Sequence, residues 1–270
     1  MMSHAAAALG YEVRANNLSR ASENRIHDDA VARRFGFTGA LVPGVEVHAY
    51  ACHPAVARWG RDWLARGTME SRFLKPVYDQ TMVQVAAEPQ PDGALAIRVE
   101  SGGVLAATAT AALPAGPEAA PDIADFPWHA PPAHADRPEA GDVTLAPGRW
   151  LGTAAEPMTA QVLADYLAGI GETEPLYAAQ GLVHPGLVLR LCNKALTHNV
   201  GLGPWIHVGS AARGLDAARV GEALDVRARI LSNEDRKGHR IVELDALVVA
   251  DAARPVARVR HTAIWRVRGG

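Results

Sequence analysis

The strongest constraint on the fold of this chain is an internal repeat on either side of a proline-rich segment. Pro43-Gly44 recurs as Pro185-Gly186, an offset of 142 residues, and an apolar run follows each pair. The same offset relates Trp63 to Trp205, Gly67 to Gly209 and Met82 to Leu224. Near the ends of the halves, "VLAATATAAL" and "VARVRHTAIW" align at an offset of 152. Several landmarks in the same order indicate a duplicated unit.

The segment between the two halves predicts a connector. Residues 114–147 are rich in proline and alanine, and proline at this density disfavours helix and strand interiors. Phe126 and Trp128 are expected to fix its middle to a folded surface. The chain is therefore divided into an N-terminal unit (1–113), a connector (114–147) and a C-terminal unit (148–270).

Each half is predicted to contain a long apolar helix followed by strands. Helices are expected in "VEVHAYACHPAVARW" after Gly44, where Pro54 should end or kink the helix, and in "LVLRLCNKALTHNV" after Gly186. Strands are expected in "TMVQVAAE", "LAIRVES", "VLAATATAAL", "ALDVRARIL", "RIVELDALVVA" and "VARVRHTAIWRV". A helix followed by strands, without βαβ alternation, predicts an α+β fold with antiparallel sheets.

Composition excludes several classes of partner. The net charge of −2 gives no electrostatic basis for binding nucleic acid or an anionic membrane surface. The start "MMSHAAAALG" lacks the features of a signal peptide, and no apolar run reaches membrane-spanning length. Cys52 and Cys192 lie in apolar stretches, which favours buried thiols in a reducing compartment. These features predict a cytoplasmic protein.

Residues 22–44, "SENRIHDDAVARRFGFTGALVPG", form the most specific motif. The order Asn-x-Ile-His, Gly-Phe-x-Gly and Pro-Gly before an apolar helix resembles the MaoC-like (R)-specific enoyl-CoA hydratases of the hotdog fold. The following "SRFLKPVYDQTMVQV" resembles that family's strand after the central helix, and "GETEPLYAAQGLVHPG" (171–186) resembles a shortened copy of the loop. The resemblance covers nearly all of the chain outside the connector. It implies two tandem hotdog folds, an acyl-CoA or related acyl thioester as ligand, and no cofactor besides the coenzyme A of the substrate.

In that family an Asp-x-Asn-x-x-His loop places the Asp and the His on either side of the thioester's α and β carbons. Hydration needs a base for water, an acid for the α carbon and donors for the enolate oxygen. The resemblance places the His on His27, the Asn on Asn24, the helix-start glycine on Gly44 and the Asp on Ser22. In the second half it places Glu172 at the Asp position, Glu174 at the Asn position, Tyr177 at the His position and Gly186 at the helix start. Neither half carries the full dyad.

Alternatives stay open for each candidate residue. His27 is an acid/base or a loop histidine that packs or caps a helix. Ser22 is a nucleophile or a loop hydroxyl, and no Gly-x-Ser-x-Gly elbow surrounds it to favour the nucleophile. It can also orient a water molecule or His27. Glu23 replaces the missing base if the loop turns it inward, and otherwise is solvated. Amides near Gly44 and Val45 would hold the thioester carbonyl, because the first amides of a helix lack partners.

Other residues favour structural roles. Asp28 and Asp29 are expected to begin a short helix. Glu172 and Tyr177 act as base and donor, or have a substrate-shaping or structural role. His48 and Cys52 have helical i, i+4 spacing, but no further ligands are placed near them, so core packing is favoured over a metal site. "GLGPWIH" (201–207) lacks the context of a dinucleotide fingerprint.

Three functions remain after these arguments. The leading one is a hydro-lyase that hydrates an enoyl-CoA or dehydrates a hydroxyacyl-CoA. The second is a non-catalytic acyl-CoA-binding subunit, because each half has lost one member of the dyad. The third is a thioesterase with Glu172 activating water. Arg72 or Lys75 is expected to meet a coenzyme A phosphate, and a homodimer is compatible with two hotdogs in one chain.

Overall fold

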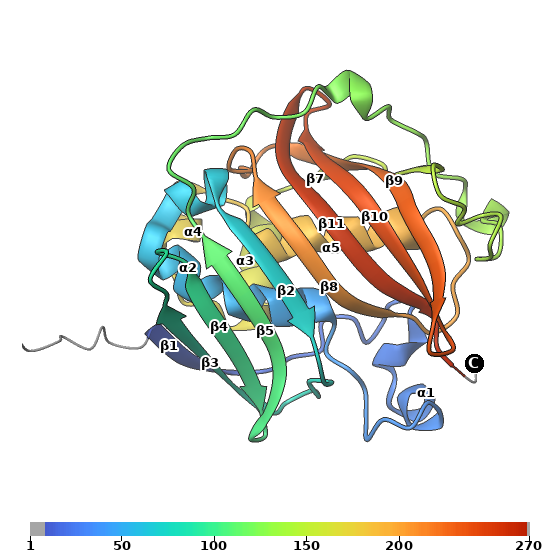
Figure 1. The fold of residues 1–270 in the computed structure, drawn as a ribbon, viewed down its shortest axis with the longest axis horizontal. Helices are drawn as coiled ribbons and strands as arrows, with labels where there is room; N and C mark the ends of the chain where they lie inside the picture. Colours follow the sequence, from blue (N-terminus) through green and yellow to red (C-terminus); the bar gives the residue numbers. More distant parts are fainter. Residues whose placement is uncertain (1–8, 269–270) are drawn as a thin grey trace, which may run out of the picture.

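One antiparallel sheet runs through both halves of the chain. The computed structural model describes residues 9–268, so the expectation about the first eight residues lies outside it. The strands are β1 (Leu9–Arg14), β2 (Thr68–Phe73), β3 (Met82–Pro89), β4 (Leu95–Ser101), β5 (Val104–Ala112), β6 (Trp150–Gly152), β7 (Glu156–Pro157), β8 (Ile206–Gly214), β9 (Ala223–Arg236), β10 (His239–Ala250) and β11 (Arg254–Arg266). Their order is β1-β3-β4-β5-β2-β8-β11-β10-β9-β6, with β7 paired to β9 (Figure 1). The six predicted strands correspond to β3, β4, β5, β9, β10 and β11.

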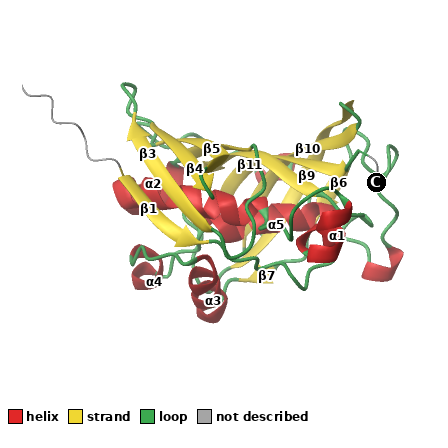
Figure 2. Cartoon of the chain, turned by 90° about the horizontal axis from the view of Figure 1, so that it is seen from below, coloured by secondary structure: helices red, strands yellow, loops and turns green. Residues whose placement is uncertain are grey.

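Two central helices lie against one face of this sheet. They are α2 (Gly44–Arg66) and α5 (Pro185–Thr197), which contact each other and begin at the two Pro-Gly repeats. The shorter helices are α1 (Asp29–Arg34), α3 (Ala160–Ile170) and α4 (Leu176–Gln180). Figure 2 shows α3 and α4 on the side of the central helices that faces away from the sheet. Alternating strand residues, as in β3, turn inward and form one apolar core with both central helices.

The halves meet where β2 pairs with β8. Ser71 lies opposite Ser210 in this pair, and both side chains are buried. The Nδ1 atom of His48 lies 2.9 Å from Ser71 Oγ, and Ser210 Oγ lies 3.1 Å from His261 Nδ1. A buried polar seam therefore joins the two halves in the middle of the sheet, and His48 takes part in it.

Helix α2 continues through Pro54, so of the two expected effects of this proline, an end or a kink, the structure excludes the end. Proline cannot donate to the carbonyl four residues earlier, that of Tyr50. That carbonyl instead accepts a hydrogen bond of 2.9 Å from the Tyr11 hydroxyl on β1. The helix breaks later, at Gly60, whose φ of 58° is outside the helical range.

The connector packs on the second half, as its aromatic residues suggest. Phe126 is buried in a cluster with Leu247 and Val249. Trp128 is half-exposed, but its Nε1 donates a hydrogen bond of 2.9 Å to the carbonyl of Thr153. The boundaries at 113/114 and 147/148 stay a prediction.

The two cysteines and the apolar character of the helices were also predicted from the sequence. Cys52 and Cys192 are buried free thiols, as predicted. Between residues 9 and 268, no helix combines the length and the apolar character needed to cross a membrane.

Candidate functional site

The imidazole of His27 is held in one tautomer. His27 ends a short 3-10 turn, Arg25–His27, that Asn24 caps through its side chain. Its Nδ1 lies 2.7 Å from the carbonyl oxygen of Leu41, which can only accept, so Nδ1 carries the proton. Its Nε2 lies 3.3 Å from the amide Nδ2 of Asn24, which donates. His27 therefore presents a lone pair at Nε2.

His27 is also kept neutral. Burial lowers its pKa below the ordinary value, and the positive charge of Arg190 lowers it further, while the hydrogen bond to Leu41 acts in the opposite direction. A neutral imidazole can act as a general base at neutral pH, and Nε2 of His27 takes a proton by giving up its long 3.3 Å contact with Asn24 Nδ2.

Asn24 fixes the loop of the first half to the second half. Its Nδ2 donates to the carbonyl of Trp205 at 2.9 Å, and its Oδ1 accepts from the Trp205 amide at 3.2 Å. The same Oδ1 accepts from the Ile26 amide at 3.3 Å. Asn24 therefore orients the turn that carries His27, which explains the need for an amide with both a donor and an acceptor.

A cavity of about 650 Å³ opens beside His27. Its walls are apolar in part, as at Val45, and cationic in part, at Arg190 and Lys194 on α5. Arg190 Nε lies 2.7 Å from Oε1 of the fully buried Glu46. Burial raises the pKa of Glu46 to about 7, although Arg190 acts to lower it. The cavity is large enough for part of an organic ligand.

The first turn of α2 lies next to His27 and supplies free donors. The backbone N–H groups of Gly44 and Val45 make no hydrogen bond to any group within residues 9–268. A β carbon at position 44 would be crowded, because it would lie 3.0 Å from His207 Nδ1 and 3.2 Å from the Phe73 ring. An anionic oxygen at this helix start would be stabilised by the amides and the helix dipole.

Two further spaces continue past this helix start. A cavity of about 30 Å³ is lined by residues that include Asn24, His27, Gly44 and His207. Beyond it lies a mostly apolar groove of about 260 Å³, in which Phe37, Phe73 and Lys75 take part. The small cavity shares lining residues with the large cavity on one side, such as His27, and with the groove on the other, such as Gly44.

Solved structures resemble the fold of this chain over nearly its whole length. A MaoC domain dehydratase of Chloroflexus aurantiacus aligns with a TM-score of 0.65 at 11% identity, covering 97% of this chain and 96% of that one. Rv0216 of Mycobacterium tuberculosis, described as having a double hotdog fold, gives 0.61 at 18% identity, with coverage of 94% and 93%. The chain has a double hotdog fold.

Further comparisons agree with that fold. A MaoC-like dehydratase aligns with a TM-score of 0.59 at 15% identity, over 96% of this chain and 98% of that one. No protein-family model matches the sequence, and no curated protein matches it. The similarity is therefore one of fold, and it confirms the α+β architecture of two tandem hotdogs.

Ser22 and Glu23, in the first hotdog, do not touch the His27 ring. Ser22 lines the large cavity, and its hydroxyl makes a long contact of 3.4 Å with the carbonyl of Asn24. The Glu23 carboxylate turns to the connector, where it accepts from Arg137 at 2.8 Å and lies 2.9 Å from His134 Nε2. Glu23 thus pairs away from His27, so the predicted replacement base is engaged elsewhere.

Glu172 of the second hotdog is closed off from solvent. Its carboxylate lies 2.6 Å from His53 Nδ1 and 3.6 Å from His184 Nε2, and it accepts from the amides of Thr173 and Glu174. Burial raises its pKa, but the neighbouring His184 and the hydrogen bond from His53 outweigh this and hold the pKa well below the ordinary value. Glu172 is a buried, multiply bonded carboxylate.

Tyr177 and Gly186 complete this closed cluster. Tyr177 is fully buried beside the His184 ring. The Gly186 amide donates to His184 Nδ1 at 3.0 Å, and a β carbon on Gly186 would collide with the Tyr166 hydroxyl. The amide expected to hold a carbonyl is already bonded. The structure therefore corrects the sequence-based expectation: Glu172, Tyr177 and Gly186 form core, and none lines the cavities described above.

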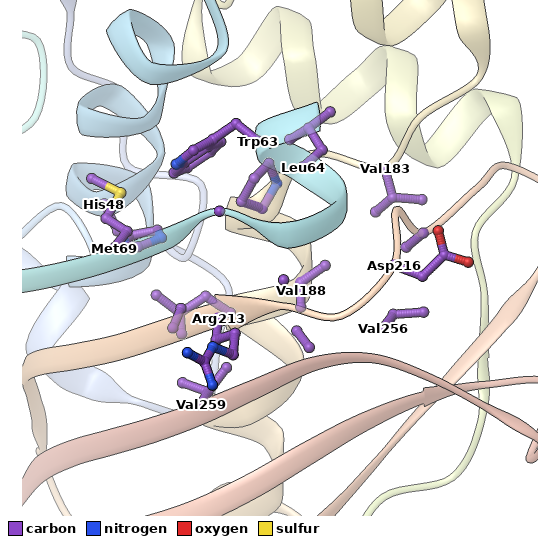
Figure 3. A pocket seen from close by; sticks show the side chains of 17 residues that line it. His48, Trp63, Leu64, Met69, Val183, Val188, Arg213, Asp216, Val256 and Val259 are labelled. Carbon is purple, nitrogen blue, oxygen red and sulfur yellow. The ribbon is translucent and has the colours of Figure 1, made fainter. Parts of the chain in front are cut away.

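The second hotdog nevertheless has a small cavity of about 70 Å³ at the start of α5. Figure 3 shows mostly apolar side chains around it, with His48 toward one end and Asp216 toward the other. Met69 of β2 and Val188 of α5 are among its walls. It occupies the place in the second hotdog that the apolar groove occupies in the first, next to the repeated Pro-Gly.

Several cavity residues were not singled out from the sequence. Arg190, Asn193 and Lys194 interrupt an apolar run at i, i+3 and i+4, a spacing that puts three polar side chains on one helical face. That pattern indicates a polar face within an otherwise apolar helix. In the sequence Trp205 is a landmark of the repeat, and His207 lies in "GLGPWIH", which resembles no known binding motif.

Proposed function

We propose that this protein is a hydro-lyase that acts on an acyl thioester, by hydrating an enoyl-CoA or dehydrating a 3-hydroxyacyl-CoA. The observation that carries the proposal is the neutral His27, whose Nε2 lone pair is presented beside a cavity that ends at the free amides of α2. The base and the anion-stabilising donors required for this reaction are then neighbours.

In the proposed hydration, the thioester carbonyl oxygen accepts from the amides at the start of α2. A water oxygen forms a bond to the β carbon while its proton moves to His27 Nε2. The π electrons of the α,β bond shift onto the carbonyl oxygen, which becomes an enolate oxygen held by the Gly44 and Val45 amides. The His27 imidazolium then returns the proton to the α carbon, and one water molecule has been added.

One histidine is sufficient for both proton transfers in this scheme. It acts first as base and then as acid, so a second carboxylate is not required for the atoms to balance. Because the same nitrogen serves both carbons, water and proton must be added to the same face of the double bond. Dehydration is the reverse sequence. The thioester would reach the start of α2 from one side, either from the large cavity or from the apolar groove, where Lys75 offers a cation to a phosphate.

The test follows the absorbance of the conjugated enoyl thioester with short, branched and dicarboxylic enoyl-CoAs. We expect wild-type protein to consume at least one of them and His27→Ala to lose about 100-fold or more in kcat/KM. His134→Ala, which removes an exposed histidine outside the cavity, is the matched control and should retain activity. Unchanged turnover in His27→Ala would contradict the mechanism.

A non-catalytic acyl-CoA-binding subunit is the second candidate. It is favoured by Ser22, which stands where the resembling family has its carboxylate and makes no contact with His27. Binding of saturated acyl-CoA without turnover of any enoyl-CoA would support it. A thioesterase has less support, because Glu172 is closed off and bonded to His53. Release of free thiol from acyl-CoA would restore that candidate.

A further inference from the structure

The small cavity at the start of α2 collects buried polar atoms that lack partners. Of the residues that line it, Asn193, Trp205 and His207 each have a buried side-chain N or O atom with no hydrogen-bond partner within the described chain. These atoms are Asn193 Oδ1, Trp205 Nε1 and His207 Nδ1. An unpaired buried polar atom is costly, so three around one cavity indicate a polar ligand.

The unpaired nitrogen of His207 is an acceptor. Its Nε2 lies 3.1 Å from the carbonyl oxygen of Gly209, which can only accept, and 2.8 Å from Ser210 Oγ. Nε2 therefore carries the proton, and Nδ1 carries a lone pair. That lone pair lies near the α2 start, 3.0 Å from where a β carbon of Gly44 would be. His207 is 5% exposed, and it comes from β8 of the second hotdog.

Asn193 supplies a second acceptor from α5. Asn193 lines both the large and the small cavity, so it lies where the two cavities meet. His27 also lines the small cavity, where its Nε2 accepts the long 3.3 Å contact from Asn24 Nδ2. The two acceptors without partners, on Asn193 and His207, require a ligand that donates hydrogen bonds, which a thioester carbonyl does not.

The volume of the small cavity limits which hydrogen-bond donor can bind there. A volume of about 30 Å³ holds one or two water molecules. Water has two O–H donors, and it can accept a hydrogen bond from Trp205 Nε1. A hydroxyl group of similar size would meet the same acceptors.

We propose that this cavity is the site of the reacting water, in which Asn193 and His207 orient the water, or the 3-hydroxyl formed from it, toward Nε2 of His27. The inference rests on the proposed function and deepens it, because it assigns the water-orienting role that the missing carboxylate would have had. Asn193 and His207 are positioning residues, since the proton moves to His27. The O–H bond that breaks is the one directed to His27, and the other O–H stays bonded to Asn193 or His207.

The test compares variants that keep or remove one polar atom. The amide of His207→Asn keeps a polar atom close to the Nδ1 position, whereas that of His207→Gln keeps one close to Nε2 and removes the acceptor from the cavity. Asn193→Asp keeps an acceptor, and Asn193→Leu removes it at similar volume. Circular dichroism and thermal unfolding verify that each variant folds.

Two readouts are measured on the full chain. The first is kcat/KM for enoyl-CoA hydration. The second is the affinity for each stereoisomer of 3-hydroxybutyryl-CoA relative to the affinity for butyryl-CoA. This measurement needs no turnover. We expect His207→Gln and Asn193→Leu to lose about 10- to 100-fold in kcat/KM for hydration. They should also lose a hydroxyl preference of about 3- to 10-fold in affinity, with butyryl-CoA binding unchanged. His207→Asn and Asn193→Asp should recover most of both.

The outcomes separate this inference from the proposed function. His27-dependent turnover with an unchanged hydroxyl preference in His207→Gln and Asn193→Leu would overturn the water site and leave the hydro-lyase standing. A hydroxyl preference that depends on Asn193 and His207, without turnover in wild type, would support the site and reject the activity. Equal loss of butyryl-CoA binding in the same variants would show that they only shape the acyl site, and would overturn the inference.

Discussion

Acid should destabilise this fold through its buried histidines, and the effect can be calculated for two of them. Burial lowers the pKa of His48 to about 3, with a further contribution from His184. Burial also lowers the pKa of His261 to about 3, with a contribution from His48. The unfolded chain binds these protons near pH 6.5, so stability is complete above that value. It is lost as pH falls from 6.5 toward 3.

The magnitude follows from the linkage between proton binding and folding. Each histidine that protonates only in the unfolded chain costs about 1.4 kcal/mol per pH unit. At pH 5, about 1.5 units below the unfolded pKa, His48 and His261 each remove about 2 kcal/mol. We therefore expect these two residues to lower the free energy of unfolding by about 4 kcal/mol between pH 7.5 and pH 5.

Equilibrium unfolding in urea between pH 4.5 and 7.5 measures this effect. His48→Asn keeps a polar atom near Nδ1 for the contact with Ser71 but cannot protonate. Its slope of unfolding free energy against pH should be smaller than that of wild type by about 1.4 kcal/mol per unit below pH 6. Met69→Leu, a core change without an ionisable group, is the control and should keep the wild-type slope. A wild-type slope in His48→Asn would refute the reasoning that His48 is buried and neutral.

Two further predictions concern the surroundings of His27 and the buried cluster around Glu172. The double variant Glu46→Gln/Arg190→Met removes the charge that lowers the pKa of His27 without burying an unpaired carboxylate. The acidic limb of the kcat/KM profile should move to higher pH, and an unmoved limb would show that Arg190 does not influence His27. Glu172→Gln should lower the free energy of unfolding by about 3 kcal/mol, because it disrupts a buried, histidine-bonded carboxylate, yet leave enoyl-CoA turnover near wild type. A large loss of turnover in a folded Glu172→Gln protein would return catalytic chemistry to the second hotdog.

Local patterns in the sequence predicted the two central helices and six of the strands, but not which of these elements contact one another. The repeated Pro-Gly, the apolar helices and six strands follow from spacing and propensity, which act over a few residues. The pairing of β2 with β8 does not, because a strand's sequence does not specify which distant edge it joins. Asn193 and His207 lie on different elements and meet Asn24 only through the tertiary fold. The closure around Glu172 likewise depends on His53, 119 residues away, which turns a motif resembling a site into packed core.

The β2–β8 seam also affects how the two pockets can change over evolutionary time. In an assembly of two identical hotdog chains, each substitution occurs twice, so a tyrosine that fills one pocket fills both. Here the two hotdogs are parts of one polypeptide, and Tyr177 fills only the second pocket while the first keeps its histidine. The closed pocket can then gain stability from packing, and the open one can retain costly unpaired polar atoms. Covalent fusion therefore lets a substitution change one hotdog and leave the other as it is, which an assembly of two identical chains does not allow.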